Sequence, residues 1–158
     1  MPEQSTSLKD RLQTDLVQAM RDKDELRRTT IRALIAAIRS AEMAGPSARQ
    51  LSEEEAQTVV RTEAKKRRES AEIYAGADRA EQAQRERDEE QLVLTYLPAQ
   101  LSREQLVGVV DEQVAAAAAE GRTGMAAMGS VVAAVRARVG QQASGGEVAA
   151  VVKASLQG

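Results

Sequence analysis

The sequence predicts an all-α protein made of two helical domains, residues 1–97 and 98–158. Three observations lead to this prediction. Strand signals are missing, because the sequence has no alternating run of β-branched residues and no Asn-Gly hairpin turn. Apolar residues instead recur at intervals of three and four along most of the chain. Pro98 interrupts that pattern, and Ser102 with Gln105 then has the spacing of a new helix start.

The amino-acid composition limits both the core and the chemistry. The 158 residues include no Phe, Trp, Cys or His and only two Tyr, so the core must be built from aliphatic side chains and alanine. Without Cys and His there are no thiol nucleophiles, disulfides, imidazole general bases or usual zinc ligand sets. We therefore expect no cofactor, no metal site and no Ser-His-Asp triad.

Charge and hydropathy indicate the compartment. The formal net charge is −2, which provides no global field to hold a polyanion. No segment of about 18 apolar residues could span a bilayer, and no early apolar run resembles a signal peptide. We expect a cytoplasmic protein without membrane contact.

The first domain is predicted to begin with two amphipathic helices. Ser7 can cap the first, in which Leu8 and Leu12 begin an apolar face with steps of three and four. Asp24 can cap the second, and Gly45 with the following proline should end it. The apolar stripe of this second helix is the widest in the chain, so we place it at the centre of the domain. It consists of Leu26, Ile31, Leu34, Ile35, Ile38 and Ala41.

A third helix is predicted from Ser52, which has Glu55 three residues later in the spacing of a capping box, to about residue 75. From residue 61 to 72 only Ala64 and Ala71 are apolar, and they lie seven residues apart on one narrow stripe. Helices that are polar nearly all round usually project into solvent.

The fourth helix should start after a cap at Asp78, and its first half is again almost wholly polar. Charge pairs four residues apart, Glu63 with Arg67 and Arg85 with Glu89, can support both helices. We therefore interpret residues 61–91 as a helical hairpin whose tip stands away from the rest of the domain.

The second domain is predicted to hold three shorter helices at about 102–120, 125–139 and 146–156. Each has a stripe of Val, Leu or Met, and glycines separate them. Three short helices with such stripes are typical of a small bundle.

The strongest candidate for a binding surface is a basic cluster on the predicted third helix. Arg61, Lys65 and Arg68 share one face at positions i, i+4 and i+7, with Lys66 beside them. Such a row suits a phosphate backbone, because each neutralised phosphate releases counterions. Interleaved glutamates leave an alternative open, in which the cluster is a solvated face with intrahelical ion pairs.

Other arginines could extend such a surface. Arg28, Arg32 and Arg39 form a second row on the predicted second helix, and Arg136 and Arg138 are cations of the tail.

An acidic run, ERDEE at residues 86–90, could in principle bind a hard cation. Arginines interrupt it, and no glycine turn arranges its oxygens as in a calcium loop. We interpret these carboxylates as partners of the basic residues across the hairpin.

Several segments resemble the YqeY family of small bacterial proteins. The first-domain resemblance rests on LKDRLQTDLVQAMRDKD, RRTTIRALIAAIRSAE and EAKKRRESAEIY, and the junction resemblance on YLPAQLS. In the tail, MAAMG and ASGGEVAAVVK are similar to the tail of the tRNA-dependent amidotransferase B subunit. The resemblance covers essentially the whole chain. It implies an all-α protein with a multihelical N-terminal domain and a three-helix tail.

The resemblance also implies a function. In the amidotransferase B subunit the similar tail helps to hold tRNA, while amide transfer takes place elsewhere in that assembly. Such proteins are associated with carbon–nitrogen ligases that use glutamine as the amide donor. The implied partners are tRNA and an amidotransferase or aminoacyl-tRNA synthetase-type protein.

Three functional hypotheses follow, of which the third is amidotransferase-linked enzyme activity that would need other subunits. The first is a noncatalytic tRNA-binding or accessory module that uses the basic hairpin face and the tail arginines. The alternative is a protein–protein adaptor without RNA contact, in which the polar hairpin or the tail docks on a partner. Salt dependence of binding separates the first two: binding to tRNA that weakens steeply with salt would support RNA contact, and a salt-insensitive complex with a protein would support the adaptor.

Overall fold

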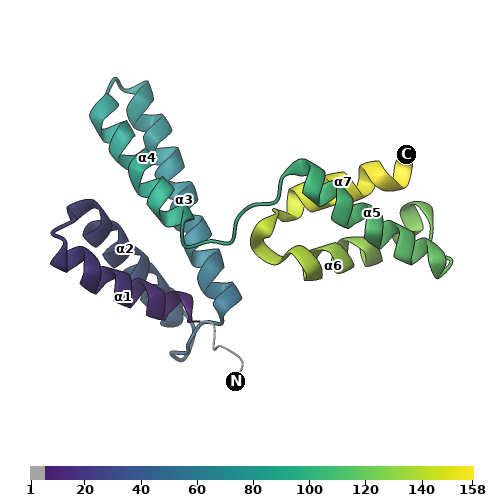
Figure 1. Cartoon of the computed structure of the whole chain (residues 1–158), viewed down its shortest axis with the longest axis horizontal. Coiled ribbons are helices and arrows are strands. Elements are labelled where there is room, and N and C mark those ends of the chain that lie inside the picture. Colours follow the sequence, from purple (N-terminus) through teal and green to yellow (C-terminus); the bar gives the residue numbers. More distant parts are fainter. Residues whose placement is uncertain (1–5) are drawn as a thin grey trace. The chain divides into compact units, whose positions relative to one another are not determined.

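The computed structural model describes residues 6–158 and confirms the all-α prediction, since no strand occurs within that range. Contacts group the described residues into two compact units, one ending at Leu97 and one beginning at Pro98 (Figure 1). No helix of residues 6–158 combines the length and the apolarity needed to cross a membrane.

The first unit consists of two antiparallel helix pairs. The helices are α1 (Leu8–Arg21), α2 (Glu25–Glu42), α3 (Glu53–Gly76) and α4 (Ala80–Leu94). Figure 1 shows α1 lying along α2 and α3 lying along α4. Contacts of α2 with both α3 and α4 join the two pairs.

Three predicted helix starts are confirmed by hydrogen bonds. The Ser7 hydroxyl accepts from the N–H of Asp10, and the Asp24 carboxylate accepts from the N–H of Arg27. At α3 the Ser52 hydroxyl and the Glu55 carboxylate form both bonds of a capping box. These bonds satisfy backbone donors that have no partner inside the helix, which fixes where each helix begins.

The core of the first unit confirms the central position predicted for the second helix. Leu12 of α1 and Leu34 of α2 have no exposed surface at all. Burying such a side chain contributes roughly 1.5–3 kcal/mol. The buried members of this core are Leu8, Leu12, Ala19, Ile31, Leu34, Ile35, Ile38, Ala56, Val60, Ala64, Val93 and Tyr96.

The predicted hairpin is formed by α3 and α4. Its contact surface is made of small side chains, because Ala64, Ala71 and Ala83 are all buried. Alanines at these positions let the two helix backbones approach closely. Residues 75–82 around the turn are exposed, and Figure 1 shows the turn end of the hairpin leading away from α1 and α2.

The prediction that Asp78 caps α4 is wrong. Arg79 is the residue before α4, and no side chain caps the helix there. Asp78 instead has φ of 58°, in the left-handed region, where it helps to reverse the chain between the two helices. Aspartate is among the few non-glycine residues that tolerate this conformation. The tight turn therefore overrides the capping preference of this aspartate.

Tyr96 fastens the end of α4 to α1. Its ring is buried in the first core, and its hydroxyl donates to Oδ2 of Asp15 at 2.5 Å. The Arg11 guanidinium lies over the ring, 5.2 Å from the centroid. Burial raises the pKa of Tyr96 above its ordinary value, and the bond to Asp15 adds to the shift.

We expect Tyr96→Phe to lower the free energy of unfolding by about 1.5 kcal/mol, because a bond to a charged acceptor is removed. The pH dependence follows from the raised pKa. The folded state holds the phenolic proton more tightly, so the stabilisation is complete below pH 10.0 and is lost as the pH rises above that value. Urea unfolding across the alkaline range should show this loss in the parent and not in the variant. A Tyr74→Phe variant that removed the same pH dependence would contradict the assignment.

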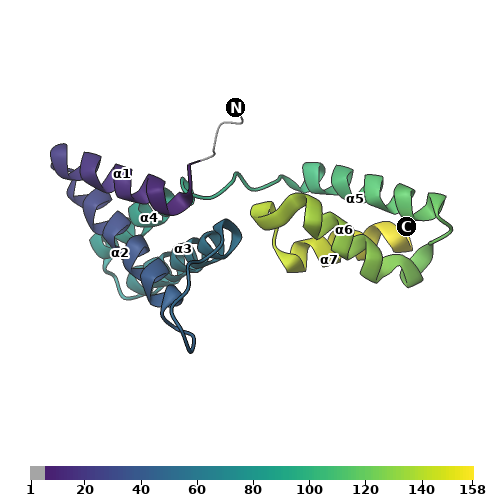
Figure 2. The same ribbon diagram turned by 90° about the horizontal axis from the view of Figure 1, so that it is seen from below.

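The second unit is a small helical bundle. It consists of α5 (Arg103–Ala119), the 3₁₀ turn η1 (Gly124–Ala127), α6 (Met128–Val139), the 3₁₀ turn η2 (Gly140–Gln142) and α7 (Gly145–Gln157). Figure 2 shows α5, α6 and α7 beside one another, and each contacts the other two. The three predicted helices are thus confirmed, although a 3₁₀ turn occupies the first residues of the predicted second one. The buried members of the core are Leu106, Val110, Ala117, Ala127, Val131, Val135, Val139, Ala143, Val148, Val151 and Val152.

Candidate nucleic-acid interface

The exposed part of the basic cluster on α3 is matched by nearby acids. Lys65 is 71% exposed and lies 4.0 Å from Glu69, whereas Lys66 lies 3.0 Å from Glu63. Exposed pairs of this kind contribute little to stability and leave the lysines able to move. This face therefore presents cations and anions together.

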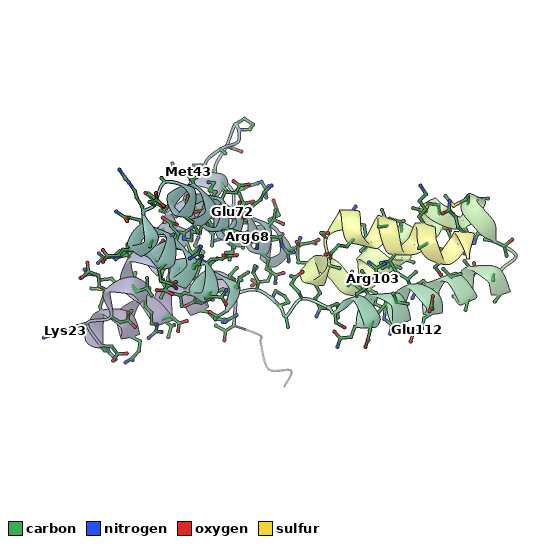
Figure 3. The ribbon with its side chains drawn as sticks, turned by 90° about the horizontal axis from the view of Figure 1, so that it is seen from above. Lys23, Met43, Arg68, Glu72, Arg103 and Glu112 are labelled. Atoms are coloured by element: carbon green, nitrogen blue, oxygen red, sulfur yellow. The ribbon has the colours of Figure 1, made fainter. Side chains whose placement is uncertain are left out.

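Arg67 and Arg68 connect the two helices of the hairpin. Nε of Arg67 lies 3.4 Å from Glu89, and Nε of Arg68 donates to Glu90 at 2.8 Å. The acidic run of α4 therefore pairs with α3, as its sequence indicated. Figure 3 labels Arg68 and Glu72 on this hairpin. In the described part of the chain no group of three or more metal-ligating side chains comes together.

Both predicted charge pairs within single helices are present. Glu63 accepts from Nη1 of Arg67 at 3.0 Å, and Arg85 lies 3.5 Å from Glu89. Burial alone would raise the pKa of Glu63, but bonds from Lys66 and Arg67 outweigh it and hold that pKa below its ordinary value.

Arg61 is less exposed than the sequence pattern suggested, whereas Arg68 is paired but remains exposed. Arg61 is only partly exposed, and burial lowers the pKa of its guanidinium. The side chain of Arg68 is 58% exposed, although that of its partner Glu90 is 11% exposed. The row that looked like a free basic face is therefore partly built into the hairpin, because α4 covers one side of it.

The arginine row of α2 has different surroundings. Arg28, Arg32 and Arg39 follow one stripe, and the rise of an α-helix places the outer two about 16 Å apart. No acidic residue occurs from 26 to 41. Arg28 lies 3.7 Å from Glu25 at the start of the helix.

Arg32 and Arg39 are exposed, and neither forms an ion pair with a carboxylate of residues 6–158. Arg32 instead has Nη2 4.0 Å from Sδ of Met20. Arg39 contributes only at a distance, by helping to lower the pKa of Glu42. The row thus carries positive charge that the described residues leave largely uncompensated.

A polar network fastens the loop after α2. The Glu42 carboxylate accepts from Lys9 at 2.8 Å and from the N–H of Leu51 at 3.2 Å. These two bonds, with Lys9 the larger influence, lower the pKa of Glu42. The Arg49 guanidinium pairs with Glu55 through two hydrogen bonds. That pairing is the main reason the pKa of Glu55 falls to about 2.

The tail arginines differ from each other. Nη1 of Arg138 lies 2.6 Å from Glu112 of α5, so this ion pair links α6 to α5. Arg136 is exposed, and its Cζ lies 3.8 Å from where a Cβ on Gly145 would stand, at the start of α7. Both residues belong to the second unit, whereas the rows on α2 and α3 belong to the first.

Sequence reasoning identified the arginines of α2 but ranked them below the α3 cluster. It also missed the loop of Met43, Arg49 and Gln50 beside them. The signal that separates the two rows was present in the sequence, because acids interrupt the α3 row and not the α2 row.

A family model described as Yqey-like protein matches residues 9–156. No curated protein matches the chain.

Proposed function

The chain belongs to the YqeY-like family, and from that premise we propose that it is a noncatalytic RNA-binding accessory protein whose RNA is tRNA. In this function the chain catalyses no reaction itself. The protein would be associated with carbon–nitrogen ligases that use glutamine, because it would help an amidotransferase or an aminoacyl-tRNA synthetase-type enzyme to handle tRNA.

The observation that carries the proposal is the arginine row of α2. Guanidinium groups suit phosphates because they present several donors in one plane. Arg32 and Arg39 are exposed and form no ion pair in residues 6–158, so binding a phosphate would not require breaking one. Lys65 and Lys66 of α3 and Arg136 of the second unit are further exposed cations, and each would make its own phosphate contact.

The proposal predicts that the double variant Arg32→Gln/Arg39→Gln binds tRNA more weakly. The slope of log affinity against log salt should flatten by roughly 0.7–0.9 for each phosphate that the variant no longer neutralises. Helix content should stay close to that of the parent, since Gln is near Arg in helix propensity. Fluorescence anisotropy with labelled tRNA at several salt concentrations measures both the affinity and the slope.

The matched control is Lys65→Gln/Lys66→Gln, which removes the same number of exposed cations from a face where acids already accompany them. Its effect should be the smaller one. Equal effects of the two double variants would contradict the claim that the α2 arginines contribute more to tRNA binding than the α3 lysines. Unchanged tRNA affinity and salt slope in the α2 variant would show that the α2 row does not contact tRNA.

The alternative function is a protein–protein adaptor, and the hairpin turn gives it one specific feature. Ile73 is 71% exposed close to this turn. A complex with a protein that survives high salt and is abolished by Ile73→Ala would favour the adaptor.

A further inference from the structure

A small pocket opens at the C-terminal end of the arginine row. It has a volume of about 320 Å³ and is lined by Arg39, Glu42, Met43, Ala48, Arg49 and Gln50. Figure 3 labels Met43, the residue that directly follows α2, and Lys23, which precedes the other end of the helix. Arg39 belongs both to this pocket and to the row, so a ligand on the row reaches the pocket directly.

The walls of the pocket combine an apolar surface with a few polar groups. Met43 is 73% exposed, and a thioether side chain adapts well to a flat ligand. The side-chain amide of Gln50 makes no hydrogen bond to any residue of 6–158, which leaves it able both to donate and to accept. Arg39 and Arg49 also line the pocket, and the guanidinium of Arg49 is paired with Glu55.

The loop that forms the pocket is held in shape before any ligand arrives. The N–H of Arg49 donates to the carbonyl oxygen of Glu42 at 3.0 Å, and its guanidinium is paired with Glu55. The Glu42 carboxylate is occupied by Lys9 and by the N–H of Leu51. A preformed site loses less conformational freedom on binding than a flexible loop would.

We infer that this pocket takes one unpaired nucleobase of an RNA whose phosphates lie on the arginine row. The inference rests on the proposed function and specifies the kind of RNA. Unpaired bases are recognised by stacking on side chains, including arginine planes, and by hydrogen bonds to their edges. Met43 and the guanidinium of Arg39 supply the stacking surfaces, and Gln50 supplies the hydrogen bonds to the base edge.

The charge in the pocket favours a base over an acidic peptide. Glu42 and Arg49 both line the pocket, but the carboxylate of Glu42 is paired with Lys9 and the guanidinium of Arg49 with Glu55. These two charges are already compensated, so they call for no opposite charge on the ligand, and a base is neutral. The phosphates that accompany the base would lie along Arg39 and Arg32, where residues 26–41 contain no acid.

The test uses two RNA hairpins of the same stem sequence, one with a single bulged 2-aminopurine and one fully paired. We expect the full chain to bind the bulged RNA about tenfold more tightly, the order of magnitude of one stacked base. Met43→Ala should remove most of that preference and leave the affinity for the paired RNA unchanged. Arg39→Gln should weaken both. Met125→Ala, which truncates an exposed methionine of the second unit, should change neither.

The outcomes separate this inference from the proposed function. Two results would overturn the assignment of the pocket as a base-binding site: equal, salt-dependent binding of both RNAs, or a preference for the bulged RNA that Met43→Ala does not alter. Either result would leave the proposed binding of phosphates by the arginine row intact. If neither hairpin RNA binds with a salt-dependent affinity, and tRNA does not either, the proposed function is overturned as well. An acidic apolar peptide that binds in a Met43-dependent way while RNA does not would assign the pocket to a protein partner and overturn the inference.

Discussion

Replacing Leu34 with alanine should lower the free energy of unfolding of the first unit by about 3–4 kcal/mol. Leu34 lies in the middle of α2 and has no exposed surface. The truncation removes buried methyl and methylene groups and leaves a cavity that close-packed neighbours fill only in part. The free energy of unfolding of a single domain is typically about 5–15 kcal/mol, so a loss of this size removes a large part of it.

Amide hydrogen exchange measures this effect region by region. Exchange should accelerate in residues 8–94 and change little in residues 103–157, because the two units have separate cores. Leu34→Met, which conserves volume, should cost less than about 1.5 kcal/mol and stays informative if the alanine variant does not fold. Val17→Ala, at a position that is 49% exposed, is the surface control. A loss below about 1 kcal/mol for Leu34→Ala would show that the core can collapse around the truncated side chain.

Replacing Arg67 with alanine should cost about 3 kcal/mol, the low end for breaking a buried ion pair by removing one partner. The side chain of Arg67 is 11% exposed, and those of Glu63 and Glu89 are 15% and 13% exposed. Without the guanidinium, two largely buried carboxylates would face each other without the cation that lies between them.

The pH dependence of this cost has a definite sign. The pKa of Glu63 lies below its ordinary value of 4.5, so its stabilising contribution is present above that pH and is lost as the pH falls below it. The stability difference between the parent and Arg67→Ala should therefore shrink in acid, as Glu63 becomes protonated in both proteins.

Urea unfolding followed by far-UV circular dichroism at neutral and at acidic pH tests the Arg67 prediction. Lys65→Ala, whose side chain is 71% exposed and 4.0 Å from its partner, should cost no more than about 1 kcal/mol. Similar losses in both variants, or a difference that grows in acid, would contradict the role given to Arg67.

The features that the sequence predicted well are local ones. The capping boxes at Ser52 and Ser102 and the caps at Ser7 and Asp24 each depend on residues at most three positions apart. Helix faces follow a fixed period, so the stripe of α2 could be identified as core without knowing what covers it.

The features that the sequence did not predict depend on tertiary contacts. Tyr96 and Asp15 are 81 positions apart, and only the packing of α4 on α1 brings them together. Arg61 has the same spacing as its neighbours on α3, yet it is partly buried, which helical period alone cannot reveal. Asp78 failed as a cap because the reversal between two packed helices required a left-handed residue at that position.

The positions of the tyrosines have a practical consequence for spectroscopy. Tyr74 and Tyr96 are the only aromatic side chains of the chain, and both belong to the first unit. Near-ultraviolet absorbance and intrinsic emission therefore report on that unit alone, while the α5–α7 bundle is optically silent in this range. Tyr96, whose hydroxyl donates to a carboxylate, and the partly exposed Tyr74 should also give distinct signals. A tryptophan introduced into the second unit would give each half of the molecule its own optical reporter.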